Sequence, residues 1–340
     1  MSCLKQSEPV ISEKMIYIYS TLDSVRDIEL VGDTLYVANG SEGLKILKLN
    51  LDDSESIEPI YEGPIFEGSQ NLIKLNYARN SELIFVLNSE DLTYVAPHNF
   101  YESIFGFGLF VGIVQCDTDN HSNSTIIYDG IEPEILTLFR HLDTGNEVQP
   151  HTTSIERSKV LNSDDGFIES FCDINDLDLD SLNYDLSDIY FYNDTLYLAN
   201  PNFSIPSIQI YYQNIDDNFE LVREDTLSAY PKTVRAFDSA YVVGLDNDAG
   251  CYIALLDTEG GVYRNFTVAK GYTIRDIHYS QNLLLLSAGY DGVLIYEWDG
   301  VNDPNPYALI SSGYAYSALV YKENKIIIGT KNGIEIYEID

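Results

Sequence analysis

"DTLYVAN", residues 33–39, returns almost unchanged as "DTLYLAN", residues 194–200. The longer stretch around the first copy, "VRDIELVGDTLYVANGSEGLKIL" (25–47), aligns without a gap on "IRDIHYSQNLLLLSAGYDGVLIY" (274–296). Similarity at three places along one chain indicates an internal repeat. A repeat decides the architecture before any single residue does.

Each repeat unit reads as short strands separated by tight turns. In the first unit, residues 25–30, 35–39 and 44–49 are rich in β-branched, aromatic and leucine side chains, and Gly, Asp, Asn and Ser stand between them. "EPIYEG" (58–63) follows as a fourth strand. Units of about 40–50 residues with four strands are typical of a β-propeller, whose blades bury one another's faces. We therefore predict an all-β fold, a β-propeller of four-stranded antiparallel blades.

The number of units predicts the number of blades. Clear units begin near residues 24, 70, 101, 184, 232, 272 and 314. They predict seven blades; eight is the second choice, because residues 131–183 are either a degenerate blade or an insertion. The last unit lacks a fourth strand, and "KMIYIYSTL" (14–22) belongs to no unit, so we expect this N-terminal strand to close the ring. The predicted organisation is a disordered tether over 1–13 and one propeller domain over 14–340.

The charge balance restricts the partners. The chain has 19 Lys and Arg against 54 Asp and Glu, a formal net charge of −35. Such a surface repels phosphate backbones and anionic lipids, so we expect no nucleic-acid binding and no membrane contact except through an anchor. A solvated acidic surface on a monomer is the simplest interpretation.

The four cysteines bear on location. Cys3, Cys116, Cys172 and Cys251 form no C-x-x-C pair, so a thiolate metal site is not expected, and a Cys116–Cys172 bridge is left open. No apolar segment approaches the roughly 18 residues of a membrane span, and no signal peptide precedes Cys3. A cysteine beside the N-terminus followed by a polar stretch resembles a mature bacterial lipoprotein. In that interpretation Cys3 carries the lipid and the protein is exported, at the periplasm or cell surface; the alternative is an incidental cysteine in a tail.

The repeat resembles a known family. "GDTLYVANGSEGLKILKLN" (32–50) is similar to the LVIVD repeat of bacterial and archaeal cell-surface proteins. The similarity is good over 24–50 and 273–299, partial over 187–212 and 316–339, and differs in having Lys-Leu-Asn where the family often has Asp-Val-Ser. The resemblance implies an exported, often anchored β-propeller and supplies no catalytic residue.

Two acidic loops are candidates for calcium, the one cofactor that the sequence suggests. Oxygen-rich turns suit a hard cation that takes six to eight oxygen ligands. The candidate ligands are Asp117, Asp119, Asn120 and Asn123 in "DTDNHSN", and Asp246 and Asp248 in "DNDAG". Neither loop completes an EF-hand. A polar hairpin turn without an ion is the alternative, because Asp, Asn and Gly are common turn residues.

Arginine gives the third candidate site. Arg26, Arg235 and Arg275 align at one repeat position, on the first strand of each unit, which lines the channel of a propeller. One hypothesis is pairing between blades with Asp27 or Asp276. The other is a cationic ring at a channel mouth that receives an anionic ligand such as a carboxylate.

These observations support three functions. The leading hypothesis is a non-catalytic surface propeller that binds a protein or glycan partner, since Tyr is abundant and favoured at interfaces. The competing hypothesis is a hydrolase or lyase with a cation on the axis, although no catalytic motif is found. The third is a structural module without a ligand. An enzyme requires titratable groups from several blades to meet in one pocket.

Overall fold

The computed structural model describes most of the chain. The described residues are 13–51, 56–63, 71–78, 83–88, 93–97, 112–114, 121–126, 134–141, 152–162, 168–173, 186–202, 204–214, 219–322 and 324–339. From residue 93 to residue 173 the description covers the backbone of the strands. Within the described part, no helix is long and apolar enough to cross a membrane.

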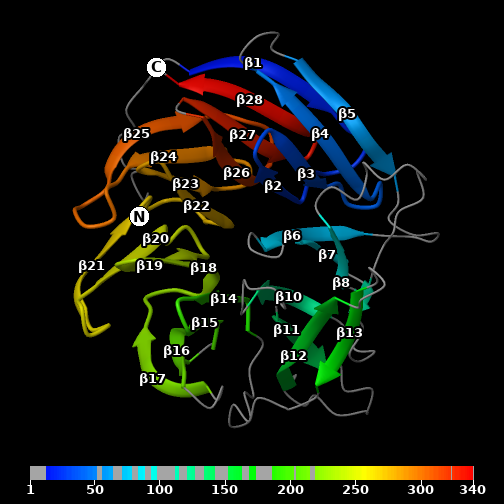
Figure 1. The fold of residues 1–340 in the computed structure, drawn as a ribbon. Coiled ribbons are helices and arrows are strands. Elements are labelled where there is room, and N and C mark those ends of the chain that lie inside the picture. Colours follow the sequence, from blue (N-terminus) through cyan, green and yellow to red (C-terminus); the bar gives the residue numbers. More distant parts are fainter. Residues whose placement is uncertain are drawn as a thin grey trace, which may run out of the picture.

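The described strands form seven antiparallel sheets of four strands each, arranged around an axis as blades 1 to 7 (Figure 1). The innermost strands of blades 1 to 7 are β2 (Asp27–Val31), β6 (Leu72–Ala78), β10 (His121–Ile126), β14 (Asp188–Tyr192), β18 (Pro231–Phe237), β22 (Asp276–Ser280) and β26 (Ala315–Tyr321). The second strands are β3 (Thr34–Ala38), β7 (Leu83–Asn88), β11 (Glu134–His141), β15 (Thr195–Asn200), β19 (Ala240–Leu245), β23 (Leu283–Ser287) and β27 (Lys325–Thr330). The third strands are β4 (Leu44–Asn50), β8 (Thr93–Pro97), β12 (Thr152–Asn162), β16 (Ser207–Gln213), β20 (Cys251–Leu256), β24 (Val293–Glu297) and β28 (Gly333–Ile339). The outer strands are β5 (Ser56–Gly63), β9 (Gly112–Val114), β13 (Ile168–Asp173), β17 (Phe219–Thr226), β21 (Val262–Val268), β25 (Asn305–Ile310) and, for blade 7, β1 (Glu13–Ser20).

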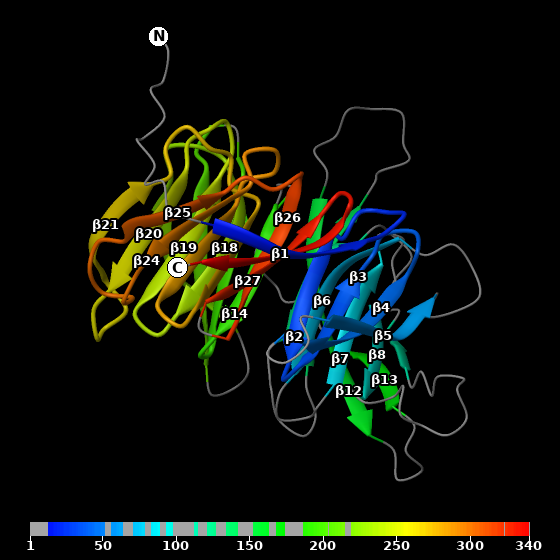
Figure 2. The same ribbon diagram turned by 90° about the horizontal axis from the view of Figure 1, so that it is seen from above.

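The N-terminal strand closes the ring, as predicted. β1 pairs antiparallel with β28, in a register that joins Glu13 to Ile339 and Ser20 to Gly333. Figure 1 and Figure 2 both show the blue first strand beside the red last one. Blade 7 therefore takes its outer strand from one end of the chain and its other strands from the opposite end, which protects the edge of β28.

Blades 2 and 3 differ in their boundaries from the sequence units. The unit expected to begin near residue 101 supplies β9, the outer strand of blade 2, rather than a blade of its own. Residues 134–173 supply β11, β12 and β13 of blade 3. The predicted total of seven is confirmed because the two differences cancel.

Much of the hydrophobic core lies between the blades. Clusters of buried side chains draw on two neighbouring blades; for example, Leu35 and Leu47 of blade 1 pack with Tyr321 and Ile327 of blade 7. Burying a Leu or Ile side chain fully contributes about 1.5–3 kcal/mol. A single blade cannot shield both of its faces, so these contacts hold the ring together.

The glycine of the repeated turn is required by its geometry. Gly43 and Gly292 end equivalent turns between the second and third strands and have φ values of +89° and +86°. A Cβ atom at Gly292 would lie 2.0 Å from the carbonyl oxygen of Ile310. No other residue fits there without moving the outer strand.

Candidate functional site

The innermost strands carry equivalent residues to the axis. Arg26 and Arg275 stand immediately before β2 and β22, and their backbone N–H groups donate to Ala38 and Ser287 at 2.8 Å in both blades. In blade 7 the equivalent residue is Tyr316, which sits at a register shift between Ala315 and Ser317. Two further bulge residues occupy this position, Ile73 in blade 2 and Lys232 in blade 5.

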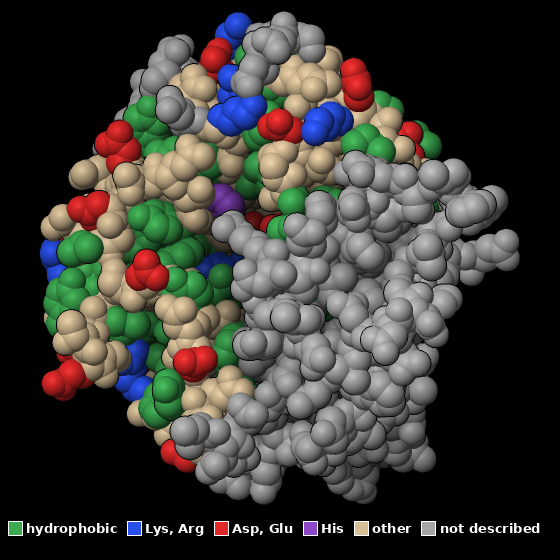
Figure 3. Space-filling view, viewed as in Figure 1, with side chains coloured by type: hydrophobic (Ala, Val, Ile, Leu, Met, Phe, Trp, Pro, Cys, Tyr) green, Lys and Arg blue, Asp and Glu red, His purple; other side chains and the backbone are tan. Residues whose placement is uncertain are grey.

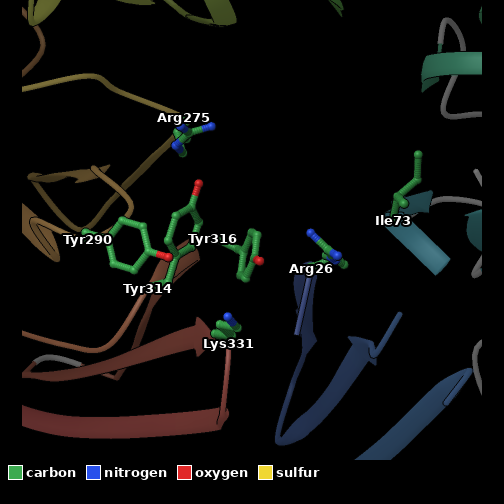
Figure 4. A pocket seen from close by; sticks show the side chains of 7 residues that line it. All are labelled: Arg26, Ile73, Arg275, Tyr290, Tyr314, Tyr316 and Lys331. Atoms are coloured by element: carbon green, nitrogen blue, oxygen red, sulfur yellow. The ribbon is translucent and has the colours of Figure 1, made fainter. Parts of the chain in front are cut away.

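One mouth of the channel is built on these positions. A pocket of about 480 Å³ is lined by Ile73 and by six residues that we call the arginine mouth: Arg26, Arg275, Tyr290, Tyr314, Tyr316 and Lys331. Figure 4 shows the three tyrosines close together, with Arg275 and Lys331 on either side of them and Ile73 across the opening. The backbone N–H of Lys331 donates to the carbonyl of Tyr314 at 3.1 Å, which fixes two of these segments together.

The tyrosine rings of the arginine mouth contact one another edge-to-face or at a tilt, and two of them make cation–π contacts with the guanidinium groups. The ring of Tyr314 lies 4.7 Å from that of Tyr290, at an angle of 89°, and 4.6 Å from that of Tyr316. The Arg26 guanidinium lies 4.8 Å from the centre of the Tyr316 ring, and that of Arg275 lies 5.4 Å from the centre of the Tyr314 ring. Burial raises the pKa of Tyr314, so this phenol stays protonated at neutral pH and can donate a hydrogen bond. Tyr290 is 80% exposed and leaves one side of the pocket accessible.

The two arginines of this mouth have no carboxylate partner among the described residues. Five arginine side chains are described, and the other three each pair with an aspartate: Arg223 with Asp225, Arg235 with Asp188 and Arg264 with Asp303. The Nε atom of Arg26 is buried and has no hydrogen-bond partner within the described part. In a chain with nearly three acidic residues for each basic one, two neighbouring arginines without an ion pair among the described residues are unusual.

Deeper in the channel lies a buried charged cluster, which we call the charged belt: Asp27, Lys74, Asp188, Arg235 and Asp276. One guanidinium nitrogen of Arg235 lies 2.8 Å from Asp188, and the other lies 3.2 Å from Asp276. The Lys74 ammonium lies 3.6 Å from Asp188. The belt therefore joins side chains of blades 1, 2, 4, 5 and 6.

Two carboxylates of the belt also bind the backbone of the next blade. Asp188 accepts hydrogen bonds from the N–H of Val234 at 3.0 Å and from the hydroxyl of Thr233 at 2.8 Å. Asp27 accepts one from the N–H of Leu75 at 2.9 Å. These bonds link blade 4 to blade 5 and blade 1 to blade 2, which is a structural role.

The belt carboxylates have divergent acidities. Burial opposes ionisation of Asp188, but Lys74 and Arg235 outweigh it and hold the pKa of Asp188 below its usual range. Burial, and then the charge of Asp276, raise the pKa of Asp27 to about 7. Burial also raises the pKa of Asp276. Three carboxylates face two cations, so a proton on Asp27 neutralises the belt.

Arg235 does not share a position with the other two predicted arginines. Its strand partner is Val242, whereas the equivalent partner in blade 1, Tyr36, pairs with Glu29. Two-residue turns join the first two strands in both blades, and counting from them places Arg235 three positions beyond Arg26. The sequence comparison aligned Val25-Arg26 with Val234-Arg235, and this alignment is three residues out of register.

The predicted cation loops are partly described. Asp246 lies 3.1 Å from the ammonium of Lys232, and Asp248 accepts a hydrogen bond from the hydroxyl of Thr273 at 3.1 Å. Three of the remaining predicted ligands, Asp117, Asp119 and Asn120, lie outside the described residues. The fourth, Asn123, lies in β10, where the backbone alone is described. Within the described part of the chain, no group of three or more His, Cys, Asp or Glu side chains is arranged to hold a metal ion.

The described cysteine adds no further group to the axis. Cys251 is a free, buried thiol, and burial raises its pKa, so it is protonated and unreactive. Cys3 and Cys116 lie outside the described residues, as does the side chain of Cys172. The predicted lipid anchor and disulfide stay predictions.

Sequence reasoning missed the tyrosines and Lys74. Tyr314 and Tyr316 belong to "GYAYSAL" (313–319), at the start of the innermost strand of blade 7. Counting back along each innermost strand from its hairpin turn identifies them. This count aligns Tyr316 with Arg26 and Lys74 with Asp27.

Solved structures share the fold at low sequence identity. The C-terminal WD40 domain of Sif2 matches with a TM-score of 0.64 at 13% identity, over 97% of this chain and 99% of that one. The WD40 β-propeller domain of Doa1 matches with a TM-score of 0.61 at 12% identity, over 96% and 97%. The computationally designed Ika8 protein matches with a TM-score of 0.61 at 9% identity, over 98% and 100%. These likenesses show a WD40-like β-propeller fold and nothing about activity.

Neither the family models nor the curated proteins give a match. No protein-family model matches the sequence, and no curated protein matches it either. The site must therefore be interpreted from its own geometry.

Proposed function

We propose that this protein is a non-catalytic binding propeller that holds an acidic group of a protein or glycan partner in the arginine mouth. The observation that carries the proposal is a pair of arginines without carboxylate partners among the described residues, Arg26 and Arg275. They lie beside three tyrosines whose rings contact one another. A guanidinium group binds a carboxylate through two parallel hydrogen bonds. The tyrosines supply apolar surface and a phenolic donor next to that carboxylate.

The net charge of the chain limits which acidic ligands can bind. A net charge of −35 repels an extended polyanion before it reaches the pocket. A single carboxylate on an otherwise neutral segment avoids most of this repulsion. The partner therefore presents an isolated acidic group, such as a chain-terminal carboxylate or a uronic acid residue.

The proposal is tested on an array that carries the same peptides with free and with amidated C-termini, and matched oligosaccharides with and without uronic acid. We expect binding to the carboxylate forms only, and weaker binding as salt is raised. Arg275→Gln lowers affinity about tenfold or more, the value of a charge-assisted hydrogen bond. Arg264→Gln is the matched control, because Arg264 pairs with Asp303 on the outer side of the ring.

Two outcomes would overturn this function: equal binding to carboxylate-free probes, or full binding by Arg275→Gln. The thermal midpoint separates the site from a structural role. Because Arg275 has no ion-pair partner among the described side chains, Arg275→Gln should melt like the wild type.

The location and family of the protein belong to the same proposal. The chain is exported and held at the cell surface by a lipid on Cys3, as a member of the LVIVD-repeat proteins. What supports the family is the repeat over 24–50 and 273–299, which coincides with the first three strands of blades 1 and 6. Labelling of growing cells with an alkyne-tagged palmitate tests the anchor: the wild type should be labelled and Cys3→Ser should not.

The charged belt favours a second candidate function. Titratable groups from five blades meet there, and Asp27 has a pKa of about 7, which suits a proton donor or acceptor at neutral pH. A hydrolase or lyase reaction on the axis is tested by assaying ester, glycoside and uronate substrates with the wild type and Asp27→Asn. Turnover that is lost in Asp27→Asn would favour catalysis over binding.

A further inference from the structure

The opposite mouth of the channel is a second, larger cavity. It has a volume of about 800 Å³ and is lined by the later residues of the innermost strands. The lining side chains used below, which we call the aromatic mouth, are Glu29, Asn76, Tyr190, Phe237, His278 and Tyr279. Figure 3 shows one face of the molecule, on which hydrophobic side chains gather beside the centre over β14–β21 and acidic ones are scattered around them.

Four of these residues share one register position with Arg235. Glu29, Asn76, Tyr190 and His278 pair with Tyr36, Phe85, Tyr197 and Leu285, which are equivalent residues of the second strands. A carboxylate, an amide, a phenol and an imidazole thus meet around the axis from four blades. This set can both donate and accept hydrogen bonds.

The cations beside this cavity are already compensated. Arg235 is held by Asp188 and Asp276, and Lys74 lies next to Asp188. His278 adds no charge, because burial, and then Arg235, lower its pKa to about 4. Unlike the arginine mouth, the aromatic mouth has no electrostatic reason to select an anion.

His278 provides a polar atom that needs a partner. Its Nε2 atom is buried and makes no hydrogen bond to any described residue. Leaving a buried polar atom without a partner costs about 1–3 kcal/mol, so such an atom in a cavity points to a ligand. A neutral imidazole accepts or donates one hydrogen bond at Nε2, which suits a hydroxyl group.

Beside His278 lies a rigid aromatic surface. The rings of Phe237 and Tyr279 lie 4.9 Å apart, and buried Trp298 supports both, at 6.2 and 5.1 Å. The indole N–H of Trp298 donates to the carbonyl of Asn302 at 2.8 Å, which fixes the ring. The Phe237 and Tyr279 rings are tilted by 59° to one another, so they form an angled aromatic wall. Such a wall next to convergent polar groups is suited to a ring with an apolar face and polar edges.

We propose that the aromatic mouth binds a neutral sugar residue, with its apolar face on Phe237 and Tyr279 and a hydroxyl group on His278. Glu29 and Asn76 face further hydroxyls from across the axis. This site lies at the other end of the channel from the arginine mouth and does not depend on what that mouth binds.

The experiment titrates the full chain with cellotriose, maltotriose, mannotriose and N-acetylchitotriose, with trigalacturonate as the charged counterpart. Binding is measured by calorimetry and by saturation-transfer NMR. We expect at least one neutral trisaccharide to bind. His278→Leu should weaken it about tenfold, the value of one lost hydrogen bond. Because Nε2 has no partner among the described residues, this variant should have a thermal midpoint equal to or above that of the wild type.

A second variant and a control keep the result decisive. Phe237→Leu keeps an apolar side chain in the core but removes one aromatic ring of the wall, so it should weaken binding of the same sugar. Arg275→Gln, at the arginine mouth, should leave neutral-sugar binding unchanged. The proposal is overturned if no neutral trisaccharide binds, if both His278→Leu and Phe237→Leu bind normally, or if Arg275→Gln alone abolishes binding.

Discussion

Arg235 and Asp188 lie in neighbouring blades, and the guanidinium group of Arg235 lies 2.8 Å from the Asp188 carboxylate at the propeller axis. The second nitrogen of the same guanidinium reaches Asp276 in the blade on the other side, at 3.2 Å. One side chain thus connects blades 4, 5 and 6. Of the two roles considered for arginine, Arg235 has the one that joins blades. The ligand role is proposed for Arg26 and Arg275.

Removing Arg235 should destabilise the whole ring. In Arg235→Met the Asp188 and Asp276 carboxylates stay buried with less compensation, and breaking a buried ion pair in this way costs about 3–5 kcal/mol. The free energy of unfolding in urea measures the loss. Arg264→Met is the control, because its exposed pair with Asp303 should contribute no more than about 1 kcal/mol. Equal losses in the two variants would contradict the role given to the belt.

Asp27 should make stability depend on pH. Its pKa is about 7 in the folded chain against 3.8 for an ordinary Asp, so the folded state binds more protons between these values. The stability that this proton contributes is complete below about pH 4 and is lost as the pH rises through about 7. Asp27→Asn removes this dependence, so its stability relative to the wild type should rise from pH 4 to pH 7.

The comparison with the wild type is needed because His278 acts in the opposite sense. Its folded pKa of about 4 lies below the ordinary 6.5, so the stability associated with neutral His278 is lost as the pH falls through that range. His278 is common to both proteins and cancels in the difference. A difference that stays flat from pH 4 to pH 7 would show that Asp27 is ionised throughout.

Gly292→Ala should lower the free energy of unfolding by more than the strain of a positive φ alone. At Gly292 a new methyl group would meet the Ile310 carbonyl at 2.0 Å, in addition to the strain of φ +86°. Gly260 offers a matched control, because its φ is +79° and no atom lies within 4 Å of the place that a methyl group would take. We expect about 1 kcal/mol for Gly260→Ala, from strain alone, and about 3 kcal/mol or more for Gly292→Ala. If urea unfolding gave similar losses of stability for the two variants, the positive φ alone would explain the loss at Gly292.

Deleting residues 2–20 should open the ring. The deletion removes β1 and the packing of Ile16, Tyr17 and Tyr19 against the core between blades 7 and 1. It exposes the edge of β28, and exposed edges pair with other chains. Size-exclusion chromatography should show oligomers, and a peptide of residues 13–21 added in excess should restore the monomer. A truncated chain that stays monomeric without the peptide would contradict this account of closure.

Much of the fold can be predicted from the sequence because each strand and turn is encoded by neighbouring residues within one repeat unit. The strand–turn units of about 40–50 residues predict four-stranded blades, and the leftover strand at the N-terminus predicts their closure. Strand register decides which side chains reach the axis, and a dipeptide match was too short to fix it for Arg235. The charged belt could not be predicted for a related reason: Lys74 and Asp188 meet only because the ring brings blades 2 and 4 to one centre.

The pairing of Glu13 with Ile339 brings the start of β1 and the end of β28 out at the same end of one strand pair. Tension that draws these two points apart would therefore break the β1–β28 hydrogen bonds one after another, like a zipper, instead of all together. The blade should therefore open at a low force when it is pulled at these two points. A short peptide that joins the end of β28 to the start of β1 would turn the two strands into a hairpin and prevent this opening.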